Sequence, residues 1–146
     1  MKSIHTTIDI EASPETIWKI LLDTEKYPEW NPLVIALTGD LKEGTNIEIT
    51  VSLGKGKPSV FKPMVLAVKE GLELRWLGSL FVKGLFDGEH SFQLMPQADG
   101  STRLLHAEVF TGVLSSLIFG MIGKDTHKAF EAMNKALKER AEAMTQ

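Results

Sequence analysis

Strand-like alternation of apolar and polar residues limits the fold of this chain more than any other feature. Between residues 33 and 110 the alternation returns in segments of strand length, joined by links short enough for hairpins. Strands that follow one another through hairpins pair antiparallel, so the pattern predicts a meander that adds to one earlier strand. The predicted strands are 3–11, 33–37, 47–53, 59–69, 72–77, 85–96 and 102–110.

Two helical patterns complete the chain. Ser13 can cap a short helix that begins at Pro14, where the missing N–H of proline costs nothing, and the proline-rich run 27–33 ends it. Beyond residue 124, apolar residues recur at helical spacing between lysines and glutamates, which predicts a long C-terminal helix with one apolar face. We therefore predict a single α+β domain over residues 1–146, in which a curved seven-stranded antiparallel sheet wraps around that helix.

The last predicted hairpin carries polar residues on the side that should be apolar. If the turn spans residues 98–100, Leu94 faces Leu104, Phe92 faces His106 and His90 faces Glu108. This register keeps the apolar residues of that side together, whereas a slip by one residue would scatter them. We expect His90 and Glu108 to form a cross-strand pair, because a buried polar group needs a partner.

Four roles are open for His90, His106 and Glu108. The pair can be purely structural and fix the strand register. The same groups can orient the polar end of a ligand in an apolar pocket. His90 and Glu108 are also the candidates for general acid-base catalysis, although no nucleophile accompanies them. Two histidines and a carboxylate have the ligand types of a metal site, but Phe92 opposite His106 intrudes, so we predict no metal and no cofactor.

Composition narrows the classes of function. The chain of 146 residues has a formal net charge of -3, which argues against a general nucleic-acid binder. It has no cysteine, so disulfides, thiolate catalysis and cysteine-ligated zinc are excluded. The N-terminal run lacks the apolar core of a signal peptide, and no apolar run reaches membrane-spanning length. We expect a cytoplasmic protein without a membrane span.

Five stretches of the sequence together resemble one known superfamily. They are IDIEASPETIWKILLDTEKYPEWNP, LELRWLG, GLFDGEHSFQL, TRLLHAEVFTGVL and KAFEAMNKALK. In this order they are similar to the START-related SRPBCC superfamily of polyketide cyclase/dehydrase and lipid-transport proteins, in an uncharacterised bacterial branch. The resemblance covers nearly the whole chain and implies a helix-grip fold, with the sheet around the C-terminal helix and an apolar cavity between them. Superfamily members include lipid carriers, hormone receptors, cyclases and co-chaperone domains, so the fold alone does not fix the activity.

These considerations lead to one expected function and two alternatives. We expect the chain to bind or carry a small apolar molecule, lipid-like or aromatic, in the cavity between the sheet and the helix. The alternatives are a cyclase or dehydratase acting on an enclosed carbonyl substrate, and a stress-related or co-chaperone-like interaction domain. The predicted ligand-binding residues are Trp76, His90, Phe92, His106, Glu108, Phe110, Phe130 and Met133.

The mouth of the cavity is predicted separately. Trp30 and Phe86 are large apolar residues in predicted loops, and Phe119 belongs to the apolar segment 113–123 before the long helix. Glycines flank this segment, so it would serve either as a mobile lid over the entrance or as the contact of a homodimer.

Overall fold

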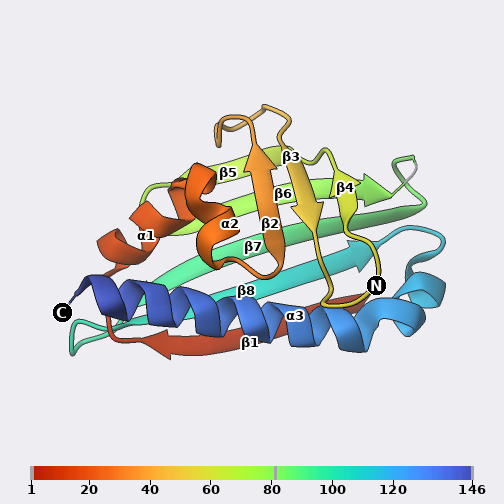
Figure 1. Cartoon of the computed structure of the whole chain (residues 1–146). Helices are drawn as coiled ribbons and strands as arrows, with labels where there is room; N and C mark the ends of the chain where they lie inside the picture. Colours follow the sequence, from red (N-terminus) through yellow and green to blue (C-terminus); the bar gives the residue numbers. More distant parts are fainter. Residues whose placement is uncertain (1, 81, 146) are drawn as a thin grey trace.

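The computed structural model describes residues 2–80 and 82–145, and Figure 1 shows their arrangement. Within these residues eight strands form two antiparallel sheets, of order β1-β8-β7-β6-β5 and β2-β3-β4. The strands are β1 (Lys2–Ile10), β2 (Val34–Thr38), β3 (Glu48–Val51), β4 (Ser59–Phe61), β5 (Met64–Lys69), β6 (Glu73–Leu80), β7 (Phe86–Pro96) and β8 (Thr102–Thr111). The helices are α1 (Pro14–Leu22), the 3-10 turn η1 (Thr24–Lys26), α2 (Tyr27–Trp30) and α3 (Ser115–Met144).

The long helix α3 runs along one face of the five-stranded sheet, as Figure 1 shows, and packs mainly against β1, with further contacts to β8 and α1. Its buried residues recur at helical spacing, so one stripe faces the sheet while lysines and glutamates face outward. The buried stripe includes Thr126, Ala129, Phe130, Met133, Asn134, Leu137 and Ala141. The predicted α+β architecture with a sheet around a C-terminal helix is therefore confirmed.

The predicted single seven-stranded sheet is wrong in one respect. The segment 59–69 forms two strands rather than one, because β4 pairs with β3 whereas β5 pairs with β6. The chain changes partner at Pro63, a residue without a backbone N–H to continue a ladder. The result is a separate sheet of β2, β3 and β4, and β4 contacts β6.

The chain between α1 and β2 is more ordered than the predicted turn. Ser13 caps α1 as predicted, since its Oγ accepts a hydrogen bond from the Thr16 N–H at 3.2 Å. The run predicted only to turn contains the short helix α2, whose Tyr27 hydroxyl donates to the Leu21 carbonyl at 2.6 Å. After α2, Oδ1 of the buried Asn31 accepts hydrogen bonds from the backbone N–H groups of Leu33, just before β2, and of Val34, the first residue of β2, both at 2.9 Å.

The predicted register of the last hairpin is confirmed. In the β7–β8 ladder His90 lies opposite Glu108, Phe92 opposite His106, and Leu94 opposite Leu104. On the other side of β8, β1 places Thr6 opposite His106. The polar residues of β7 and β8 therefore lie in the middle of the five-stranded sheet, on the face that α3 covers.

Candidate functional site

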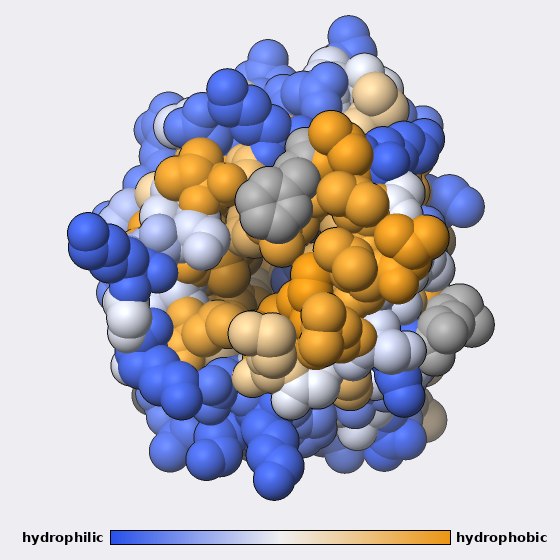
Figure 2. Space-filling model, turned by 90° about the vertical axis from the view of Figure 1, so that its right-hand side faces the viewer, coloured by the Kyte–Doolittle hydropathy of each residue, from blue (hydrophilic) through white to orange (hydrophobic). Residues whose placement is uncertain are grey.

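A partly open cavity of about 290 Å³ lies between the two sheets and α3. The five-stranded sheet supplies Trp76, Phe86 and Phe110 to its wall, and α3 supplies Phe130. The opposite wall comes from β2, β3 and β4, with Ile49 among its apolar residues. Figure 2 looks at the end of the molecule where α3 begins and shows a hollow ringed by hydrophobic residues. A concave, mostly apolar space of this size is typical of a small-molecule site.

Two glycines leave room for this cavity. Gly78 in β6 and Gly88 in β7 lie opposite one another in the ladder, and both line the cavity. A Cβ atom at Gly88 would overlap Oε2 of Glu108, so the absence of a side chain there makes the space that the carboxyl group occupies. A Cβ at Gly78 would meet only Cβ of Pro63, at an ordinary 3.6 Å.

The polar end of the cavity is made by His90 and Glu108, which project from neighbouring strands. Their closest approach, between Nδ1 of His90 and Oε1 of Glu108, is 3.9 Å, which is too long for a hydrogen bond. The expected cross-strand pairing of His90 with Glu108 is present in the ladder, but the two side chains do not hydrogen-bond to each other. His90 uses its other ring nitrogen instead, and Nε2 lies 2.6 Å from Nε2 of His106.

From His106 a chain of hydrogen bonds continues away from the cavity. Nδ1 of His106 lies 2.7 Å from Oδ1 of Asn134 on α3, and Nδ2 of Asn134 donates to Oγ1 of Thr6 on β1 at 2.8 Å. The Thr6 hydroxyl in turn donates to the backbone carbonyl of His106 at 2.7 Å. His90 and these three residues are all buried, so the chain of hydrogen bonds links β7, β8, α3 and β1 inside the core.

Aromatic rings enclose the two histidines. The ring of His106 stacks on Phe130 with centroids 4.1 Å apart and planes 6° apart, and it also stacks on Phe92 at 4.4 Å. His90 stacks on the same two phenylalanines, with 4.9 Å between centroids in each case. The faces of these rings stabilise a positive charge less well than water does, so these contacts favour the neutral imidazoles.

Burial shifts the protonation of all three groups toward neutrality. It lowers the pKa of His90 well below 6.5, with a smaller effect from His106, and it lowers the pKa of His106 to about 3 against the opposing hydrogen bond from Asn134. Burial raises the pKa of Glu108 to about 8. Near pH 7 the cavity therefore presents the neutral imidazole of His90, with the neutral His106 behind it, and a carboxyl group of Glu108 that is mostly protonated.

Comparison with known proteins identifies the family. The sequence matches the family "Polyketide cyclase / dehydrase and lipid transport" over residues 1–142. The chain belongs to this family. The predicted resemblance is thereby confirmed, and among curated proteins no sequence matches the chain significantly.

Solved structures share the fold of this polyketide cyclase / dehydrase and lipid transport domain. A START superfamily protein from Mycobacterium smegmatis is 23% identical, with a TM-score of 0.75 over 97% of this chain and 98% of that one. A Thermus thermophilus protein is 19% identical, with a TM-score of 0.76 over 99% and 100% of the two chains. The Zhui aromatase/cyclase from a Streptomyces species is 11% identical, with a TM-score of 0.80 over 99% and 96%.

The structure of this family member places the predicted site residues in three groups. Trp76, His90, Glu108, Phe110 and Phe130 line the cavity, and so does Phe86, which lies in β7 rather than in a loop. The other predicted residues, as far as the described chain shows, lie off the cavity wall. These are Phe92, His106 and Met133, which are buried behind it, Trp30 in α2, and Phe119.

The predicted position of the segment 113–123 before the long helix is also corrected. Residues 115–123 form the first turns of α3 and do not precede it. Ile118 and Ile122 from these turns line the cavity, while Phe119 contacts Phe110 with ring centroids 5.5 Å apart. The ring of Phe119 also lies over Gly123, where a Cβ would meet it at 3.1 Å. Helical spacing thus places alternate sides of the segment toward the cavity and toward the surface.

Thr6 and Asn134 are the site residues that the sequence interpretation missed. Asn134 interrupts the buried stripe of α3 one turn after Phe130, and Thr6 lies in a strand of otherwise apolar alternation. A polar residue on the buried face of a helix is a signal for a buried partner. The partner itself, His106, is distant in the sequence from both residues.

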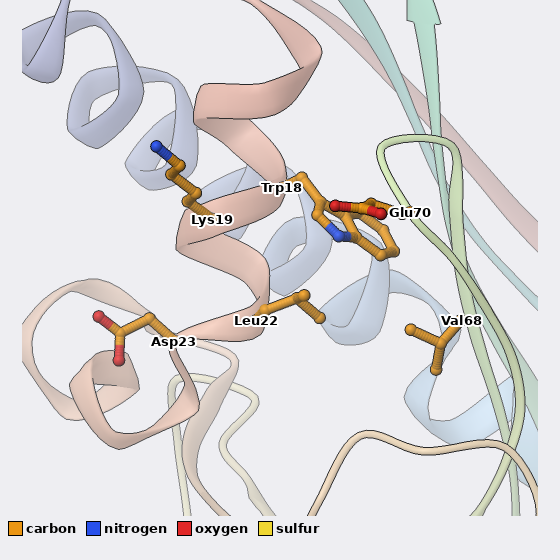
Figure 3. A pocket seen from close by; sticks show the side chains of 6 residues that line it. All are labelled: Trp18, Lys19, Leu22, Asp23, Val68 and Glu70. Carbon is orange, nitrogen blue, oxygen red and sulfur yellow. The ribbon is translucent and has the colours of Figure 1, made fainter.

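Two other observations bear on the choice of site. Figure 3 shows a hollow on the outside of the domain, between α1 and the β5–β6 hairpin, where Lys19 and Asp23 do not converge with Glu70 on one point. In residues 2–80 and 82–145, no three metal-binding side chains converge, and no helix is long and apolar enough to cross a membrane. The cavity, with buried polar groups at one end, is the stronger candidate site.

Proposed function

We propose that this chain is a cytoplasmic protein that binds or carries a small, largely apolar molecule in the cavity between the sheets and α3. The observation that carries the proposal is a partly open, mostly aromatic and aliphatic space with the buried His90 and the partly exposed Glu108 at one end. Burial of apolar surface is worth about 25 cal/mol per Å² and would supply most of the affinity. The polar pair would set the orientation of the ligand.

Native mass spectrometry of the protein purified from its own host tests the proposal. A defined apolar molecule at near-stoichiometric occupancy, identified after organic extraction, is the expected result. A thermal-shift panel of lipids and aromatic compounds provides the second measurement, because a ligand that binds only the folded state raises its melting temperature. A protein that carries nothing and responds to no member of the panel would overturn the proposal.

Two tryptophan substitutions on α3 give a matched test of location. Ile118 lines the cavity, whereas its neighbour Leu117 points outward with 65% of its surface exposed. Ile118→Trp should fill part of the cavity and weaken binding of any panel hit at least tenfold. Leu117→Trp should leave the affinity unchanged. Equal affinities of the two variants would show that the ligand binds elsewhere.

An enzymatic role is the alternative that a specific observation favours. The neutral imidazole of His90 beside the carboxyl of Glu108, in a mostly apolar cavity, has the groups needed to move a proton on a bound carbonyl compound. A cyclase or dehydratase would lose orders of magnitude in rate on His90→Ala while it keeps its affinity for apolar ligands. A carrier would lose only stability and selectivity.

The start of α3 favours an interaction through its outer side. Val113, Leu117 and Met121 are 81%, 65% and 73% exposed, and apolar side chains gather on this end of the molecule in Figure 2. Exposed apolar clusters commonly mark contact surfaces. A homodimer, or a protein partner of a co-chaperone-like domain, would use this surface. Sedimentation of wild type and of Leu117→Glu distinguishes a dimer, which the charge would dissociate, from a monomer.

A further inference from the structure

The hydrogen-bond chain behind the cavity has one direction, which begins at Thr6. The Thr6 hydroxyl donates its only proton to the carbonyl of His106, so its oxygen is left to accept from the side-chain amide of Asn134. That bond fixes the orientation of the amide, with Nδ2 toward Thr6 and Oδ1 toward His106. Oδ1 is an acceptor only, so Nδ1 of His106 must carry a proton.

The same logic passes through both histidines. A neutral imidazole carries one proton, so a proton on Nδ1 of His106 leaves its Nε2 as a bare acceptor. The 2.6 Å contact between the two Nε2 atoms then requires that His90 donates from Nε2. His90 is also neutral, since it is enclosed by Phe92 and Phe130 with 5% of its surface exposed. Its Nδ1 is therefore an unprotonated acceptor.

This unprotonated nitrogen lies at the cavity beside a second unpaired group. Within the described chain, neither Nδ1 of His90 nor the carboxyl group of Glu108 makes a hydrogen bond, and both residues line the cavity. The two groups are 3.9 Å apart, so an oxygen atom on the cavity side can lie about 2.8 Å from each, with an angle of about 90° at that oxygen. Such an atom can donate to Nδ1 of His90 and, while Glu108 carries its proton, accept from Glu108.

We propose that the cavity recognises the hydroxyl group of an uncharged molecule, a phenol or an alcohol, which donates to Nδ1 of His90 and accepts the carboxyl proton of Glu108. A hydroxyl group is suited to this place because it offers a donor and an acceptor on one atom. The inference rests on the proposed binding function and names the ligand class for that cavity.

Other head groups fit this pair of side chains less well. The oxygen of a ketone or an ether can accept from Glu108 but has no proton for His90, whose lone pair would remain unpaired. A carboxylate would bring a buried negative charge against that lone pair. An ammonium group would suit an ionised Glu108, so a cation is the competing ligand class that the test must include.

Four probes with the same naphthalene body separate these classes. They are 2-naphthol, 2-methoxynaphthalene, 2-naphthoate and 2-naphthylmethylammonium, and their dissociation constants for the wild-type protein are measured at pH 6.5. We expect 2-naphthol to bind at least tenfold more tightly than each of the other three. Glu108→Leu, which removes the carboxyl donor, should reduce the advantage of the naphthol over the ether.

The outcomes distinguish the ligand class from the binding function. Equal affinities for the naphthol and the ether, or tightest binding of the cation or the carboxylate, would overturn the ligand class and leave the binding function standing. Failure of all four probes to bind would contradict both. Nitrogen-15 NMR of the imidazoles adds a test that needs no ligand: His90 should carry its proton on Nε2 and His106 on Nδ1. The opposite tautomers, or a charged imidazole at pH 6.5, would also overturn the inference.

Discussion

Replacement of Glu108 by glutamine should change how the stability of the protein depends on pH. Burial raises the pKa of Glu108 from 4.5 to about 8, so between these values the folded chain keeps a proton that the unfolded chain releases. Stability supplied by this group is fully present below pH 4.5 and is lost as the pH rises toward 8. Glutamine has a similar shape and no titration, so Glu108→Gln removes this dependence.

The magnitude follows from the two pKa values. For each pH unit over which the folded state holds one more proton than the unfolded state, the unfolding free energy falls by about 1.36 kcal/mol. Between pH 6 and pH 8 the unfolding free energy of the wild type should therefore fall by roughly 2 kcal/mol relative to that of Glu108→Gln. His90 and His106 have lowered pKa values and act in the opposite direction, mainly below pH 6.5. They are present in both proteins, and their contribution therefore cancels in the difference.

Urea unfolding of both proteins at several pH values measures this difference. Glu139→Gln is a suitable control, because Glu139 is exposed on α3 and its side chain is in water whether the chain is folded or not. The control should follow the wild-type profile. A constant difference between wild type and Glu108→Gln from pH 6 to pH 8 would show that the carboxyl is ionised in the folded protein and would refute the reasoning.

Two further substitutions test Gly88, which leaves room for this carboxyl group, and Asn134, which accepts a hydrogen bond from His106. Gly88→Ala should push the flexible carboxyl of Glu108 aside, so calorimetry should show that the preference for 2-naphthol over its methyl ether is lost, while stability changes by less than about 1 kcal/mol. Gly78→Ala is the control, because the added methyl group meets no close contact, and it should keep the preference. Equal behaviour of the two variants would contradict the role of Gly88. Asn134→Leu should leave Nδ1–H of His106 without an acceptor and cost about 1–3 kcal/mol in urea unfolding, and an unchanged unfolding free energy would show that the amide is dispensable.

The parts of the fold that follow from local periodicity could be predicted from the sequence. Alternation with a period of two fixed the register that places His90 opposite Glu108, because any slip would expose the apolar side. The break in the segment 59–69 was also predictable in principle, since Pro63 cannot donate to a continuous ladder. The segment before residue 124 shows helical spacing too, as Ile118 and Ile122 precede Thr126 and Phe130 at intervals of four.

The hydrogen-bond chain could not be predicted in the same way. Thr6 and His106 are 100 residues apart, and His106 and Asn134 are 28 apart, so their contact depends on how β1 and α3 pack on the finished sheet. From the strands alone, the natural partner of His90 was Glu108, directly across the ladder. The sequence pattern could not show that the His90 ring turns toward His106, because this orientation belongs to a packed cluster in which Phe130 comes from α3 rather than from the strands.

The free-energy cost of burying these hydrogen-bonded polar groups is itself an argument that they serve a ligand. A fully apolar core at these positions would avoid the desolvation of two imidazoles, an amide and a carboxyl group, and replacement of buried polar groups by packed apolar ones is often neutral or stabilising. Three of the four groups hydrogen-bond to one another, and their hydrogen-bond chain ends at the cavity with an unpaired Nδ1 on His90, beside the separate and also unpaired carboxyl of Glu108. A network that existed only to hold the fold would have no reason to end unpaired at an apolar cavity. A network fixed in advance by Thr6 and Asn134 would instead hold Nδ1 of His90 in place for a ligand, which lowers the entropy lost on binding.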